Sequence, residues 1–160
     1  MKRFLPVLLL VFLLFCACNE KKDFLAYQQK NPTLECVVNE KFELVISKSD
    51  IITIKVKKPS EISALYFEFG QGDGYAINGD LKIPLGRNSA CGLYALSNVL
   101  SLENESILSV VDQGKNSIVT FENDLGTYTI TYGKNLLPSH IEIHSEKFDY
   151  DIVVNGISLE

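Results

Sequence analysis

The two histidines of the chain lie close together, with an acidic residue between them. His140, Glu142 and His144 alternate with Ile141 and Ile143 on a predicted strand, so the three polar side chains share one face. Imidazole and carboxylate groups are zinc ligands. Residues four apart on a strand nevertheless lie about 13 Å apart, because each residue advances the strand by about 3.3 Å. One ion cannot reach both histidines without help from a neighbouring strand, so we expect a solvated polar face and no metal site.

Motifs for catalysis are weak along the whole sequence. Neither Gly-x-Ser-x-Gly nor His-Glu-x-x-His occurs. A serine or cysteine nucleophile paired with His140 or His144 stays open, although no local motif supports it. The glycines of Gly70-x-Gly72-x-Gly74 could form a phosphate-binding loop, but that loop requires a following helix, and a strand-like segment follows here. We expect a glycine-rich hairpin, no catalytic residue and no cofactor.

Two cysteines near the N-terminus point to covalent modification instead. Met1-Lys2-Arg3 precedes an apolar run over residues 4–15, which ends in Cys16-Ala17-Cys18 and a charged segment. A basic start, a short apolar run and a small residue before a cleavage point are typical of a secretory signal. The run is shorter than the roughly 20 residues of a membrane-spanning helix. Its end resembles the lipobox of bacterial lipoproteins, in which a cysteine after a small residue receives a diacylglyceryl thioether and becomes the new N-terminus.

Cys18 fits this role better than Cys16, because small Ala17 precedes Cys18 and bulky Phe15 precedes Cys16. The resemblance implies a signal peptide over residues 1–17, cleavage between Ala17 and Cys18, and palmitate-type acyl chains on Cys18. It implies an anchor on the extracytoplasmic face of the cell membrane. An uncleaved signal anchor and an ordinary secreted protein are the alternatives.

The remaining cysteines, Cys36 and Cys91, would lie outside the cytosol, where a disulfide is permitted. Either they pair with each other or they are two buried thiols that pack as small apolar residues. The sequence does not show whether the two sites meet in space.

The charge of the chain excludes one large class of partners. Its formal net charge is −5, and the predicted signal would remove the basic Lys2 and Arg3. Nucleic-acid binding depends on neutralising phosphates with basic side chains, so this acidic chain is not expected to bind nucleic acid. The same charge disfavours electrostatic docking on anionic lipid, so the acyl chains would have to hold the protein at the membrane.

Periodicity predicts a short tether and one β-rich domain. Residues 18–31 form the expected tether, and residues 32–160 form the domain. Apolar residues alternate with polar ones in many short segments separated by Gly, Asn, Asp and Pro turns, which is typical of antiparallel strands. The expected fold is mainly β: a curved antiparallel sheet or half-barrel.

One segment has the period of a helix. Residues 89–102 carry apolar side chains around most of the circumference, and Asn88-Ser89 offers an N-cap. Such a helix needs burial on most sides, so we place it in or over the concave face. Helical spacing makes Leu93, Leu96, Val99 and Leu100 the candidates for a ligand cavity, with ordinary core packing as the alternative.

The order of these elements resembles a known group of proteins. A lipobox and tether precede hairpins, the phrase at residues 57–67, an apolar helix ending Asn98-Val99-Leu100, and a C-terminal run of strands that includes residues 137–143. This order resembles the LolA/LolB-like lipoproteins, which include carriers of the LppX/LprG type. The resemblance implies a half-barrel whose apolar concavity shelters acyl chains.

The expected function is therefore that of a non-enzymatic, lipid-anchored envelope protein that binds a lipid or acyl chain. The alternative is a structural or sensory module with a filled core that binds another envelope protein.

Overall fold

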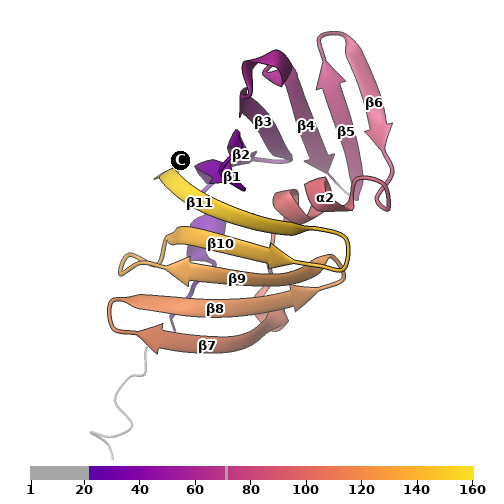
Figure 1. The fold of residues 1–160 in the computed structure, drawn as a ribbon. Coiled ribbons are helices and arrows are strands. Elements are labelled where there is room, and N and C mark those ends of the chain that lie inside the picture. The colour runs from indigo at the N-terminus through magenta and orange to yellow at the C-terminus, as the bar shows by residue number, and fades with distance from the viewer. Residues whose placement is uncertain (1–21, 71) are drawn as a thin grey trace, which may run out of the picture.

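A single antiparallel sheet dominates the computed structural model, which describes residues 22–70 and 72–160 (Figure 1). Within these residues the eleven strands lie in the order β6-β5-β4-β3-β2-β1-β11-β10-β9-β8-β7. The strands are β1 (Thr33–Val38), β2 (Phe42–Lys48), β3 (Ile52–Lys58), β4 (Leu65–Gly70), β5 (Asp73–Asn78), β6 (Leu81–Leu85), β7 (Ile107–Gln113), β8 (Asn116–Asn123), β9 (Gly126–Tyr132), β10 (Pro138–His144) and β11 (Asp149–Ser158). The expectation of a mainly β, antiparallel fold is confirmed. Ala17 and Cys18 lie outside the described residues.

The sheet consists of two runs of consecutive hairpins that are joined by one long-range strand pair. Each strand pairs with its neighbour in the chain from β1 to β6 and from β7 to β11. The joint between these halves is the antiparallel pair of β1 and β11, in which Val38 lies opposite Ile152. Strands β6 and β7 are left as the two free edges, so the sheet is open. The predicted glycine-rich hairpin is confirmed, because Gly70 ends β4 and pairs with Asp73 of β5.

The core lies on one face of the sheet, and alternation along the strands explains why. In β9, Tyr128, Ile130 and Tyr132 are fully buried, while the threonines between them face the other side. The same alternation buries Ile141 and Ile143 of β10. Side chains of successive strand residues point to opposite faces, so this pattern creates one apolar face and one polar face.

The packed part of the chain begins near Phe24 rather than at residue 32. A 3-10 turn, η1 (Ala26–Gln29), follows Phe24 and Leu25, and both side chains are buried together with Tyr27. The rings of Phe24 and Tyr27 lie with their centroids 5.1 and 6.5 Å from that of Tyr132. Residues 24–29, which were expected as tether, therefore belong to the domain.

The α-helix of the described residues, α2 (Cys91–Asn98), is shorter than the expected 89–102. Its N-cap is Ala90 and makes no side-chain cap, while the Ser89 hydroxyl donates to the Gly86 carbonyl instead. Beyond the helix, the Val99 carbonyl accepts a hydrogen bond from Gln28 Nε2 at 3.2 Å. Two other 3-10 turns, η2 (Ser60–Ile62) and η3 (Asn104–Ser106), complete the described chain. No helix within the described ranges has the length and apolar character to cross a membrane.

Candidate functional site

An apolar pocket of about 220 Å³ lies between α2 and the strands of the N-terminal half of the sheet. Its walls come from β1 to β4, the turn η2, helix α2 and β11. The lining residues are Val38, Phe42, Leu44, Ile54, Val56, Ile62, Leu65, Phe67, Leu93, Leu96 and Tyr150. All except Tyr150 have wholly apolar side chains, so the pocket fits a hydrocarbon ligand better than a polar one.

Strand register explains how residues distant in the sequence form one wall. Leu44 of β2 lies opposite Val56 of β3, and Ile54 of β3 lies opposite Phe67 of β4. Residues opposite each other in neighbouring strands point to the same face. The wall is therefore a continuous apolar surface that crosses three strands.

A glycine lets α2 approach the last strand at the side of the pocket. A Cβ atom added at Gly92 would collide with the hydroxyl of Tyr150. Without a side chain at this position, the Tyr150 ring can sit against the helix and line the pocket. Burial raises the pKa of Tyr150 above its ordinary value.

Exposed apolar side chains continue the surface beyond the pocket. Phe42 and Ile62 line it and are themselves exposed. Phe67 of β4 lies opposite Ala76 of β5, which lies opposite Ile83 of β6. In the same way, Leu65 is linked to Leu81 through Asn78 of β5. Both β6 side chains are exposed and share the face of the pocket. The apolar surface is therefore larger than the pocket itself.

The structure separates the four cavity candidates into two pairs. Leu93 and Leu96 line the pocket, and Leu96 is almost fully buried. Val99 and Leu100 follow the helix, have no exposed surface and are not part of the lining. The strand residues that form most of the wall were not among the candidates. The alternation of apolar and polar residues predicted which face of each strand is apolar. It did not predict which part of that face would line a pocket instead of packing against other side chains.

Cys36 and Cys91 are free thiols in the structure, so the disulfide considered from the sequence is not formed. Cys36 is buried on β1, and burial raises the pKa of its thiol to about 12. It packs as a small apolar residue, because the thiolate is disfavoured away from water. Cys91 is half-buried at the start of α2.

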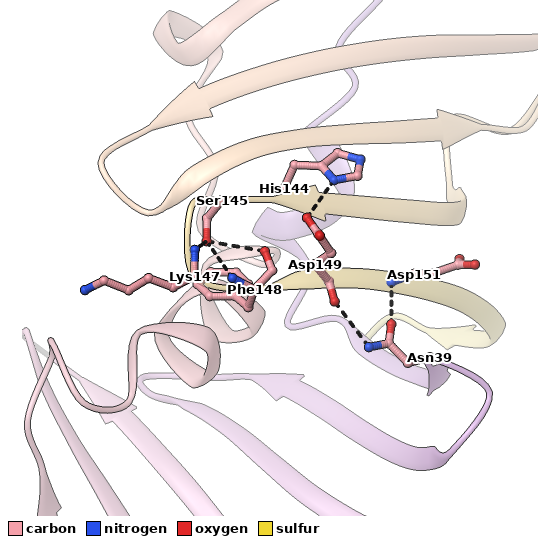
Figure 2. A network of polar contacts seen from close by, with 7 residues as sticks. All are labelled: Asn39, His144, Ser145, Lys147, Phe148, Asp149 and Asp151. Carbon is pink, nitrogen blue, oxygen red and sulfur yellow. Dashed lines mark hydrogen bonds and ion pairs between the residues drawn. The ribbon is translucent and has the colours of Figure 1, made fainter.

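The two histidines lie on the opposite, solvent-facing side of the sheet. His140 Nε2 lies 2.6 Å from a carboxylate oxygen of Asp151. His144 Nδ1 lies 2.9 Å from a carboxylate oxygen of Asp149 (Figure 2). Each histidine thus pairs with a different aspartate of β11. Glu142 lies between them on the same face, opposite Asp151. Within residues 22–70 and 72–160 no group of three His, Cys, Asp or Glu side chains could hold a metal ion.

The rest of this polar cluster is structural. The Asn39 side chain donates to the Asp149 carbonyl at 3.2 Å and accepts from the Asp151 amide at 2.7 Å, which fixes the β1–β2 turn to β11 (Figure 2). The Ser145 hydroxyl oxygen accepts from the amides of Lys147 and Phe148 at 3.1 and 3.2 Å. Because Ser145 is held by its own turn, it is not oriented toward His144 as a nucleophile would be.

A larger hollow of about 500 Å³ lies beside α2 and the β8–β9 and β10–β11 turns. Acidic, basic, amide and apolar side chains all line it. Two of the lining residues, Arg87 and Asp124, form an ion pair at 2.6 Å. This mixture favours no ligand class, so the apolar pocket is the stronger candidate.

Comparison with known proteins shows a similarity in fold only. No family model matches the chain, and no curated protein matches it. Among solved structures, the chain is similar to an uncharacterized conserved protein from Thermus thermophilus, with a TM-score of 0.51 and 8% sequence identity. The similarity covers 86% of this chain and 84% of that one, so the two share an overall architecture across most of their length.

Proposed function

We propose that this chain is a lipid-anchored protein of the cell envelope that binds an apolar ligand, such as an acyl chain, in the pocket beside α2. The observation that carries the proposal is the pocket lining, in which ten of eleven side chains are wholly apolar. The lipobox at Cys18 supports the anchor and the extracytoplasmic location.

The proposal includes a half-barrel form in which the sheet curves around α2. Support comes from contacts of the helix with both halves of the sheet. Tyr128 of β9 donates a hydrogen bond to the Ala95 carbonyl at 3.3 Å, and Leu93 and Leu96 face the pocket on β1 to β4. In Figure 1, α2 is drawn between β4–β5 and β11. A helix held from both sides would act as the roof of the concave face.

The size of the pocket favours a single hydrocarbon chain. Ligand pockets for drug-sized molecules are typically about 300–1,000 Å³, and this one is about 220 Å³. Part of one acyl chain would enter, and the remainder would lie along Leu81 and Ile83, which are exposed on the same face. The protein would therefore bind one chain and need no catalytic residue.

Native mass spectrometry of the detergent-free protein tests the ligand directly. We expect a co-purified lipid mass, and we expect the delipidated protein to bind a fluorescent fatty acid. Leu93→Gln places an amide in the pocket wall and should weaken fatty-acid binding by about tenfold, equivalent to ~1.4 kcal/mol. Val153→Gln is the matched control, since Val153 is exposed at a position of β11 opposite His140, on the polar face.

The anchor has its own test. Metabolic labelling with palmitate should mark the wild type and leave Cys18→Ser unlabelled. The contrary outcome is a labelled protein that shows only its own mass, with no bound lipid and no fatty-acid uptake. That result would overturn the proposed ligand binding and favour a module that binds another envelope protein.

A further inference from the structure

Strand β7 is an edge strand with unusual side chains. Leu108, Val110 and Val111 are 61%, 47% and 50% exposed. Edge strands are commonly protected by lysine, proline or charge, because their free backbone groups can pair with other chains. The opposite edge, β6, follows this rule with Lys82 and Pro84. Strand β7 contains neither lysine nor proline, and its one charged residue, Asp112, is held in an ion pair.

The start of the described chain lies on this edge. Lys22 Nζ donates to Asp112 Oδ1 at 2.7 Å and to Ser117 Oγ at 3.2 Å, so it bridges β7 and β8. The hydrogen bonds that Lys22 and Ser117 donate to the Asp112 carboxylate lower its pKa. Cys18 precedes Lys22 by four residues, and four residues span at most about 14 Å. An acyl chain on Cys18 would therefore hold Lys22, and with it the β7 edge, close to the bilayer.

We propose that the edge formed by Leu108, Val110 and Val111 rests on the phospholipid bilayer in which Cys18 is anchored. This inference rests on the proposed lipid attachment. The side chains would enter the boundary between headgroups and acyl chains, and the free backbone groups of β7 would be hydrogen-bonded by water and headgroups. Apolar contact carries the docking, because the basic Lys22 is already paired with Asp112.

A second copy of the chain fits this edge less well. The pairing of β7 with β8 is irregular between Ile107 and Ser109, and a bulge of this kind disturbs the regular row of backbone groups that a partner strand needs. Antiparallel self-pairing centred on Val110 would also place Leu108 opposite Asp112, where Lys22 already lies. A membrane surface imposes no register and tolerates both features.

Docking through β7 would orient the apolar pocket. The pocket walls run from β11 to β4, which lie four and eight positions from β7 in the sheet order. At ~4.8 Å per strand this corresponds to about 19–38 Å measured along the sheet. The pocket walls would therefore lie several strands away from the docked edge.

The chain contains no tryptophan, which allows a clean fluorescence test. Val110→Trp and Val111→Trp are made in the full lipidated protein, each reconstituted in phosphatidylcholine vesicles with plain or brominated acyl chains. Val153→Trp is the control, because Val153 is 47% exposed on the polar face of β11, on the other side of the sheet from the pocket. Circular dichroism verifies that each variant is folded.

We expect brominated lipid to reduce the emission of the Val110→Trp and Val111→Trp variants at least twofold and to leave that of Val153→Trp unchanged. Equal quenching of the Val110→Trp and Val153→Trp variants would overturn the proposal. A blue-shifted emission without quenching, together with cross-linked dimers, would also overturn it and assign the edge to a second copy.

Palmitate labelling distinguishes this failure from that of the proposed function. A labelled protein whose Val110→Trp variant is not quenched would retain the anchor and lose only the docking edge. An unlabelled protein would lose both the anchor and this proposal. Quenching in a labelled protein that takes up no fatty acid would uphold the docking edge and reject the ligand.

Discussion

The hydroxyl of Tyr128 on β9 donates a hydrogen bond to the carbonyl oxygen of Ala95 in α2, at 3.3 Å. This bond joins the helix to the C-terminal half of the sheet, while Leu93 and Leu96 of the same helix meet the N-terminal half. The helix is thus held from two directions. Four residues along β9, the hydroxyl of Tyr132 is also buried, but it has no hydrogen-bond partner within the described residues.

These two tyrosines should respond in opposite ways to loss of the hydroxyl. Tyr128→Phe breaks a buried hydrogen bond and should lower the free energy of unfolding by about 0.5–1.5 kcal/mol. Tyr132→Phe removes a buried hydroxyl that is not hydrogen-bonded, so its stability should equal or exceed that of the wild type. Urea denaturation of both variants checks the pair, and a marked loss of stability in Tyr132→Phe would contradict it.

The segment before β1 should contribute to the stability of the domain. The Phe24 ring is buried, and its centroid lies 5.1 Å from that of Tyr132. Phe24→Ala should lower the free energy of unfolding by about 3–5 kcal/mol, as loss of a core aromatic does. Lys30→Ala, at an exposed residue just after η1, is the control and should change stability by less than about 0.5 kcal/mol. If Phe24→Ala is as stable as the control, residues 24–29 do not contribute to the domain and belong to the tether.

Alkaline pH should destabilise the fold. Burial raises the pKa values of Cys36, Tyr27 and Tyr128 to about 12, from ordinary values of 9.0 for the thiol and 10.0 for the phenols. The folded chain keeps protons that the unfolded chain releases, so this contribution is complete below pH 9 and is lost as the pH rises toward 12. Urea denaturation at pH 8, 10 and 11 should show falling stability. Cys36→Ala should show a shallower fall, of up to ~1.4 kcal/mol less per pH unit between pH 9 and 12.

The same burial predicts a difference in thiol reactivity. Iodoacetamide at pH 8 should modify the half-buried Cys91 first and leave Cys36 unmodified until the protein is unfolded. Peptide mass spectrometry locates the label. A protein in which neither thiol is modified, even after unfolding without reductant, would indicate the disulfide that the structure lacks.

The alternation of apolar residues was sufficient to predict the mainly β fold and most of the hairpins. Strand β7 is not predicted by alternation, because Leu108, Val110 and Val111 do not alternate strictly with polar residues and the β7–β8 register is irregular between Ile107 and Ser109. The helix was predicted too long, because Val99 and Leu100 continue its apolar pattern. Both residues are buried in the core beyond the helix, and helical spacing alone cannot distinguish such residues from helical ones. The pocket depends on which strands lie beside α2. That arrangement includes the pairing of β1 with β11, which joins residues more than a hundred positions apart.

Leu96 and Leu100 test whether α2 roofs an open pocket or simply fills a core. Both are buried, but Leu96 lines the pocket and Leu100 does not. Leu100→Ala should lower the free energy of unfolding by about 3–5 kcal/mol, because it leaves a new cavity among fully packed neighbours. Leu96→Ala should cost only about 2–3 kcal/mol, since part of its surface already faces open space. The two variants should also differ in function: fatty-acid affinity should change in Leu96→Ala and stay at the wild-type value in Leu100→Ala. Equal losses of stability with unchanged fatty-acid binding would place Leu96 in an ordinary filled core.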